Sequence, residues 1–259
     1  MNAAVLAAVL VLSPAATPKE RALYDEAVRL TLATETGRSL AEQAAALGLK
    51  TEVRFEDLSG IGGRAEPSHS GDRVVLARSL LAWKAGWAGL QAARTLAHEA
   101  FGHILAQQRA RSAGVSWELG CTLDDEVNAA VIGYLVELEA GWRFLDPNAE
   151  LLLTDRAAYE ASLLTQQPAY AVTLREAELD APVAVLRARL AELSGSRPTL
   201  VEHFAERLAY LESDLVHPAA LAAYKAHPFR AALRAEIAAR IERLRAVAPP
   251  PPALQSPGT

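Results

Sequence analysis

Apolar side chains recur at helical spacing along most of this chain. Residues 18–33 carry Leu23, Ala27 and Leu30 at intervals of three to four, with Pro18 at the first position. Proline is favoured there because its missing N–H would have no intrahelical partner. The pattern predicts a first amphipathic helix over this range.

A second, shorter helix is expected after Gly37, which interrupts the periodicity. Ser39 and Glu42 have the Ser-x-x-Glu spacing of a capping box, and Gly48 stands where a helix would end. The sequence therefore predicts a helix that begins near Ser39 and stops at Gly48.

Two stretches have the pattern of strands. Polar and apolar residues alternate over 51–55, and residues 73–77 are apolar after Arg73, with two adjacent valines. The glycine-rich segment 59–63 lies between them and lacks the lysine–serine ending of a phosphate-binding loop. We interpret this segment as a turn between the strands.

Long helical patterns follow the second strand. Residues 89–112 form one, with Gly114 just beyond its end, and residues 123–144 form another with Thr122 or Asp124 as its cap. From about residue 147 the chain is helical in pattern, with breaks at prolines. These elements predict a predominantly helical α+β fold with a small sheet and a helical C-terminal part.

The two ends of the chain differ from its middle. Residues 1–12 are an apolar run followed by small residues, too short to span a bilayer but typical of a signal peptide. We expect a signal peptide over 1–17, one domain over 18–248 and a disordered proline-rich tail over 249–259. The protein would then be periplasmic or secreted; if the run is instead the first helix of the domain, the protein is cytoplasmic.

The main chemical signal lies inside the helix predicted over 89–112, where His98 and His103 bracket Glu99. Imidazoles are common zinc ligands, and a neighbouring carboxylate can act as a general base. Positions five apart differ by about 140° on a regular helix, so the two rings would diverge. A π-type turn would bring them to one face. Gly102, which costs about 1 kcal/mol relative to Ala in a helix interior, indicates such a turn or a close approach of the backbone.

The pattern His-Glu-x-x-Gly-His resembles the signature of the dipeptidyl peptidase III family of zinc peptidases. The segment 125–130 is similar to that family's E-E-C-R-A-E segment, whose second glutamate binds zinc; Glu126 holds that position. Asn128 replaces the family's arginine, and Ala130 replaces its outer glutamate. Only these two short segments match, so the resemblance is one of site design within the broad zincin group.

The resemblance implies a zinc peptidase with a zincin-like active helix. His98, His103 and Glu126 would hold Zn²⁺, and Glu99 would be the catalytic base. In zincins an edge strand beside the active helix pairs with the extended substrate, and residues 74–77 would take that role.

The residues themselves leave the third ligand open. Glu126 would lie in the first turn of its helix, where an acidic side chain is also favoured by the helix dipole alone. Asp125, Glu137 and Glu139 are alternative ligands. Several other side chains could reach the metal or stabilise an oxyanion, although each alone is more typical of a structural or exposed position: His203, His217, His227, Tyr134, Tyr210 and Tyr224. His69 is interpreted as a surface residue.

Composition narrows the classes of partner. The 26 Lys and Arg against 31 Asp and Glu give a net charge of −5, and no basic run stands out, which argues against nucleic acid. The single cysteine, Cys121, excludes an intramolecular disulfide and is interpreted as a small buried residue, with a ligand role as the alternative.

Two functions remain open at this stage. The first is zinc-dependent hydrolysis of a peptide or protein substrate. The second is a non-enzymatic helical protein of the cell envelope that binds a partner and retains a relic or structural metal site. Convergence of a third ligand on the two histidines would favour the first.

Overall fold

The computed structural model describes residues 9–58, 61–66, 71–115, 122–142, 148–166, 173–193 and 218–248, with the single positions 205, 208, 209 and 212. In chain order, the elements in these segments are β1 (Leu10–Leu12), α2 (Pro18–Ala33), α3 (Glu35–Ala46), β2 (Thr51–Glu56), β3 (Gly63–Glu66), β4 (Asp72–Ala77), η1 (Arg78–Ala82), α4 (Ala85–Ala97), η2 (His98–Ile104), α5 (Leu105–Ser112), α6 (Leu123–Glu139), α7 (Asn148–Thr154), α8 (Arg156–Gln166), η5 (Glu176–Asp180), α9 (Pro182–Leu193), α11 (Pro218–Ala226) and α12 (Pro228–Val247). Of these, η1 and η5 are 3-10 helices and η2 is a π-helix.

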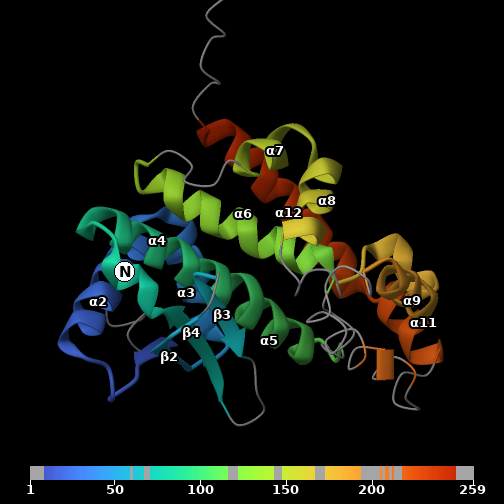
Figure 1. Ribbon diagram of the computed structural model, residues 1–259, viewed down its shortest axis with the longest axis horizontal. Helices are drawn as coiled ribbons and strands as arrows, with labels where there is room; N and C mark the ends of the chain where they lie inside the picture. The colour runs from blue at the N-terminus through green and yellow to red at the C-terminus, as the bar shows by residue number, and fades with distance from the viewer. Residues whose placement is uncertain are drawn as a thin grey trace, which may run out of the picture.

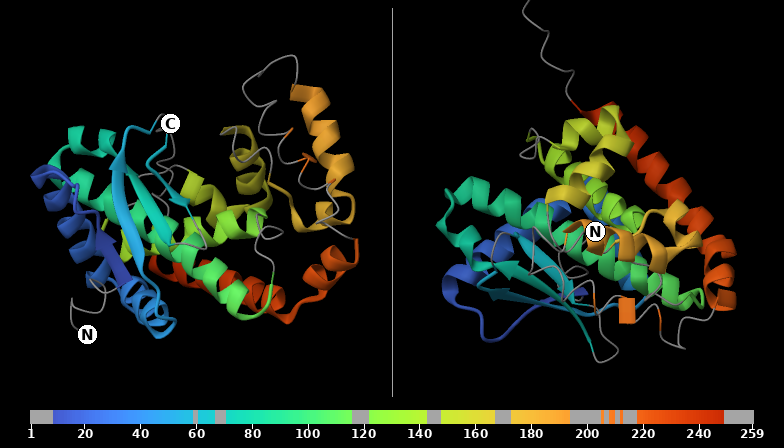
Figure 2. Two further views of the ribbon diagram at one scale, coloured as in Figure 1. Left: turned by 90° about the horizontal axis from the view of Figure 1, so that it is seen from below. Right: turned by 45° about the vertical axis from the view of Figure 1, so that its right-hand side comes forward.

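The predicted fold class is confirmed, because a small mixed sheet is joined to a predominantly helical remainder. The central helix, formed by α4, η2 and α5 in succession, lies with the sheet on one side and α6 on the other, and α12 packs on α6 in turn (Figure 1). In Figure 2 the sheet and α2 lie at one end of the molecule, and α9 and α11 at the other. The central helix and α6 therefore lie at the middle of the structure.

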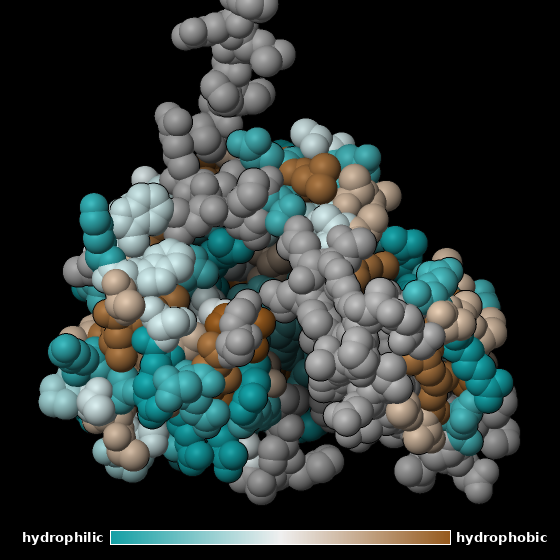
Figure 3. Space-filling view, in the orientation of Figure 1, coloured by the Kyte–Doolittle hydropathy of each residue, from teal (hydrophilic) through white to brown (hydrophobic). Residues whose placement is uncertain are grey.

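The sheet has the strand order β1-β2-β4-β3, parallel except for β3, which runs antiparallel to β4. One face buries Val53, Phe55 and Val74 against the helices. The other face carries ion pairs such as Arg54–Glu52 and is hydrophilic in Figure 3. The sheet thus covers one side of the central helix and exposes a charged outer surface.

The expectation that residues 74–77 form the edge strand is wrong. They belong to β4, which has β2 on one side and β3 on the other, so its backbone groups are engaged on both sides. The strand at this edge of the described sheet is β3, which begins at Gly63, the last residue of the segment interpreted from sequence as a turn. It was missed because its four residues include a glycine and acquire strand character only by pairing with β4.

The helix predictions hold in part. The first helix has the predicted bounds 18–33, with Thr17 as its cap. The second begins at Glu35 instead of Ser39, because the Thr34 side chain accepts a hydrogen bond from the Gly37 backbone N–H and caps the helix earlier. The helix predicted over 123–144 is α6, which ends at Glu139; residue 144 lies outside the described residues.

Residues 9–12 belong to the folded domain of this chain. Val9 and Leu10 are buried, β1 pairs with β2, and the Leu10 carbonyl accepts a hydrogen bond of 2.7 Å from the Tyr24 hydroxyl. The signal peptide and the location derived from it stay predictions. The proline-rich tail and residues 1–8 lie outside the described residues. Among the described helices, none combines the length and apolarity needed to cross a membrane.

Candidate metal centre

The central helix widens into a π-helix at the histidine motif. The segment from His98 to Ile104 is π-helical, and the backbone N–H of Leu105 bonds to the carbonyl of Ala100, five residues earlier. The helix continues without a break into α5 and ends before Gly114, whose positive φ of 74° suits the left-handed position after a helix. The predicted wide turn is therefore confirmed.

The wide turn brings the two histidine rings together. The Nε2 atoms of His98 and His103 are 3.2 Å apart, and their rings meet edge to face with centroids separated by 5.0 Å. Both Nε2 atoms thus face one small volume, as the sequence hypothesis required.

Glu126 faces the same volume from α6. Its Oε2 lies 3.6 Å from His103 Nε2 and 4.0 Å from His98 Nε2. A point equidistant from these three atoms lies about 2.1 Å from each of them, and zinc bonds to nitrogen or carboxylate oxygen are about 2.0–2.2 Å long. The donor set and its dimensions fit a zinc ion.

Glu99 borders this volume as well. His98, Glu99 and His103 form a group whose potential ligand atoms all lie within 4.8 Å of one another. Glu126 adds a second carboxylate from a separate helix, with its Oε2 at 3.6 and 4.0 Å from the two histidine Nε2 atoms. Both carboxylates therefore border the volume between the two rings.

The three consecutive acidic residues at the start of α6 have three different partners. Asp124 pairs with Arg156 of α8. Asp125 accepts a hydrogen bond of 3.1 Å from the Thr122 backbone N–H and so caps the helix. Glu126 alone is directed at the histidines. The structure thus brings the predicted ligand to the site and assigns its neighbour Asp125 another task.

The alternative ligands on α6 lie far from the histidines. Glu139 accepts hydrogen bonds from the backbone and hydroxyl of Thr36 and pairs with Arg243. Glu137 is fully buried three turns beyond Glu126, about 16 Å along the helix axis. Neither residue joins the candidate centre.

The two helices that carry the candidate ligands approach closely. A Cβ on Gly102 would lie 2.4 Å from both Cα and Cβ of Ala129, so only glycine permits this packing. The carbonyl of Ala129 also accepts a hydrogen bond from the His98 ring. Such backbone contacts orient metal-binding imidazoles. The predicted close approach at Gly102 is confirmed, and Ala129 is its partner.

Burial shifts the titration of the motif residues. It lowers the pKa of His98 well below its usual range, and the neighbouring His103 and Arg94 charges add to this effect. The ring is therefore neutral near pH 7, the form that binds a metal. Burial also raises the pKa of Glu99 to about 7, although a hydrogen bond from the Ala65 backbone N–H lowers it in part. Glu99 can therefore gain or lose a proton near neutral pH.

Ala65 places the edge strand at the site, and sequence reasoning missed it. Ala65 lies on β3, two residues after Gly63. A Cβ added to Gly63 would lie 2.5 Å from the Thr95 side chain and 2.8 Å from the Val75 carbonyl oxygen. The requirement for glycine at position 63 was visible only as a glycine-rich segment. The contact with Glu99 comes from tertiary packing.

The other histidines and tyrosines considered from sequence do not join the centre where they are described. The Tyr134 ring is buried with the Arg94 guanidinium 4.7 Å above it. Tyr224 packs under Arg230 in a separate core, and the His227 ring caps α12. The remaining candidates lie outside the described residues: His69, Cys121, His203, Tyr210 and His217.

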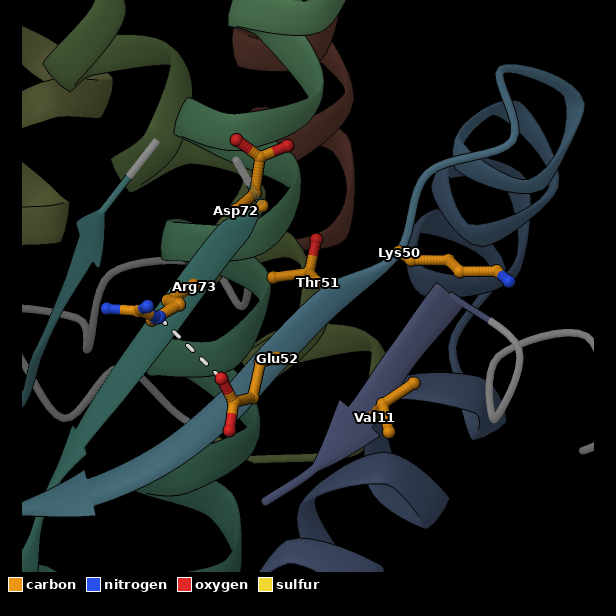
Figure 4. Close-up of a pocket in the computed structure, with 7 residues that line it drawn as sticks. Val11, Lys50, Thr51, Glu52, Asp72 and Arg73 are labelled. Carbon is orange, nitrogen blue, oxygen red and sulfur yellow. Dashed lines mark ion pairs between the residues drawn. The ribbon is translucent and has the colours of Figure 1, made fainter. Parts of the chain in front are cut away.

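A mixed-charge pocket of about 210 Å³ lies where β2 and β4 begin. In Figure 4, Arg73 and Glu52 form an ion pair across two strands, and Lys50 extends away from the other side chains. Asp72 accepts a hydrogen bond of 2.7 Å from Gln108. Because its charged groups bind one another or point outward, this pocket offers a weaker basis for chemistry than the histidine cluster.

Comparisons of this chain with protein-family models, with curated proteins and with solved structures returned no match.

Proposed function

We propose that this protein is a zinc-dependent hydrolase of peptide bonds. The observation that carries the proposal is the triangle of donor atoms from His98, His103 and Glu126, with sides of 3.2, 3.6 and 4.0 Å. Two imidazoles and one carboxylate are a ligand set of catalytic zinc sites, which leave a fourth position for water or substrate. A bound zinc ion would supply Lewis acidity that activates water and polarises a carbonyl.

The surroundings of the ligands support an open site over a purely structural one. The side chains of His98, His103 and Glu126 are 21%, 14% and 17% exposed, so solvent reaches each of them. Structural zinc sites are usually closed by four protein ligands. The exposure therefore favours the enzymatic alternative over an envelope protein with a structural metal.

Glu99 is the proposed general base. Its carboxyl group lies within the same cluster as the two histidines, and burial raises its pKa to about 7. A base whose pKa is close to the working pH can take a proton from water and return it to the leaving amine. The Ala65 N–H donates to this carboxylate and helps hold it in place.

Strand β3 offers a way to hold an extended peptide. Ala77 donates its backbone N–H to the Gly62 carbonyl, so in the antiparallel register Arg64 pairs with Val75 and the backbone groups of Ala65 point away from β4. The Ala65 N–H donates to Glu99, so its carbonyl is the group that an added strand would use. The free edge of an exposed strand can pair with an added strand. A substrate bound in this way would run past Glu99.

The test combines metal content with hydrolysis. Purified protein should bind one equivalent of Zn²⁺ and cleave members of a fluorogenic peptide mixture, and a chelator should abolish cleavage. Glu99→Gln should retain the zinc and lose the cleavage, because it removes a base and leaves the ligands. His103→Ala should lose both, while His227→Ala, in the cap of α12, should keep both.

The outcomes separate the proposal from its rival. Stoichiometric zinc without cleavage of any peptide would favour a structural metal site. Full cleavage by the Glu99→Gln protein would refute the assigned mechanism.

A further inference from the structure

The amide of Asn128 links the π-helix to the C-terminal helix. Asn128 is buried on α6, and its Nδ2 donates a hydrogen bond of 3.1 Å to the carbonyl of Gly102, the residue before His103. Its Oδ1 accepts a hydrogen bond from Arg240 of α12. A carbonyl can only accept and a guanidinium can only donate, so these two partners fix the orientation of the amide.

Arg240 is itself held in place by neighbours on two helices. It pairs with Glu236 one turn earlier on α12 at 3.2 Å. Glu236 also accepts two hydrogen bonds, of 2.8 and 2.5 Å, from Arg109 of α5. Arg109 lies six residues after His103 on the same continuous helix. The network therefore leaves the central helix at Arg109 and returns to it at Gly102.

The hydrogen-bond network of Asn128, Arg240, Glu236 and Arg109 adjoins the turn of α6 that faces the two histidines. Residues 126–129 of α6 supply the Glu126 carboxylate, the Asn128 amide and the Ala129 carbonyl that accepts from His98. One turn of α6 thus contacts both histidines or the backbone next to them. A rotation of the π-helix relative to α6 would break these contacts together.

We propose that Asn128, oriented by Arg240, is a positioning residue that holds the π-helix in the register in which His98 and His103 share one metal ion. The proposal rests on the proposed zinc site. Loss of an outer partner typically weakens metal affinity about 10- to 100-fold, and Asn128→Ala should fall in this range. Arg240→Met should have a smaller effect in the same direction, because the amide keeps its bond to Gly102.

A matched control separates positioning from stability. Arg243→Met removes a second arginine of α12, which pairs with Glu139 and Glu35 away from the π-helix. It should lower the melting temperature and leave the zinc dissociation constant within about twofold of the unsubstituted chain. A role that is only structural would predict the same result for Asn128→Ala and Arg240→Met.

The experiment is a Zn²⁺ titration against a chromogenic chelator, with the visible spectrum of bound Co²⁺ as a probe of ligand geometry. In the metal-free proteins, hydrogen exchange of residues 98–105 should be faster in Asn128→Ala than in the unsubstituted chain, and unchanged in Arg243→Met. If Asn128→Ala fails to fold, the same three measurements on Arg240→Met test the positioning role. Unchanged zinc affinity, Co²⁺ spectrum and exchange in the substituted chain would overturn the positioning role. Failure of the unsubstituted chain to bind zinc would instead refute the proposed function.

Discussion

Gly102 lies against Ala129 so closely that a Cβ on the glycine would be 2.4 Å from both Cα and Cβ of the alanine. This contact sets the separation of the central helix and α6 at the level of the site. His103 follows the glycine directly, and Glu126 lies one turn before the alanine. The packing of the two helices therefore also sets the distance between His103 and Glu126.

Gly102→Ala should destabilise the protein and weaken zinc binding together. The new methyl group meets backbone atoms, which must move, and overpacking of this kind costs about 1–3 kcal/mol. Gly86→Ala on the same long helix is the control, because its Cβ would meet only the tip of Trp142 at 3.8 Å. Because Gly86 lies in the first turn of α4, helix propensity should stabilise that variant by less than the about 0.5–1 kcal/mol of a helix interior. Urea unfolding and zinc titration check both; equal effects would contradict the close-packing argument.

The third ligand is tested by paired substitutions in the first turn of α6. Glu126→Gln should weaken zinc binding by more than the roughly 10- to 100-fold typical of an outer partner. Asp125→Asn should leave zinc affinity close to normal, because its carboxylate caps the helix through Thr122. Metal affinity measured by chelator competition distinguishes them. Loss of binding only in the Asp125 variant would move the ligand by one residue.

Ala65→Pro tests the link between the edge strand and the base. It removes the N–H that donates to Glu99 and leaves the β3–β4 hydrogen bonds intact, because this N–H points away from β4. The ionised carboxylate loses a stabilising donor, so its pKa should rise. The acid limb of the pH profile of kcat/KM should therefore move to higher pH. Ala65→Ser retains the donor and should keep the original profile; coincident profiles for both variants would exclude the contact from catalysis.

The packing of β1 on Tyr24 predicts how the protein changes if its N-terminal residues are removed. Burial raises the pKa of Tyr24 to about 12, and its hydroxyl donates to the Leu10 carbonyl. A chain that begins at Thr17 lacks β1, so the pKa of Tyr24 should fall towards its usual value near 10 and the melting temperature should decrease. Alkaline titration of tyrosine absorbance, with Tyr24→Phe to assign the signal, measures the shift. The intact mass of protein recovered from its host shows whether residues 1–17 are removed.

Local patterns predicted the parts of the site that depend on neighbours in sequence. The five-residue spacing of His98 and His103, with Gly102 between them, specified the wide turn, because helix periodicity alone fixes how far the rings diverge. Thr34 shows the limit of this reasoning, since its side chain caps α3 one turn before the capping box that Ser39 suggested. Of the two possible N-caps, Thr34 and Ser39, the earlier one begins the helix.

The remaining parts depend on contacts between distant segments. Strand β3 exists through pairing with β4, and Ala65 reaches Glu99 only after the sheet has packed on the central helix. Asn128 looked like a departure from the arginine of a resembled motif, whereas its role follows from Arg240, more than a hundred residues later. Ala65 and Glu99 are 34 residues apart and Asn128 and Arg240 are 112 residues apart, so local sequence patterns do not connect them.

The additional residue in the π-helix also sets the direction, around the helix axis, in which the side chains of α5 point. In α5, Gln108 reaches back to Asp72 of the sheet and Arg109 reaches across to Glu236 of α12. Deleting Ala100 to restore ordinary spacing would turn these eight residues by about 100° relative to α4. The additional residue thus affects both the candidate metal site and the docking of the C-terminal helices, and its removal would change the two together.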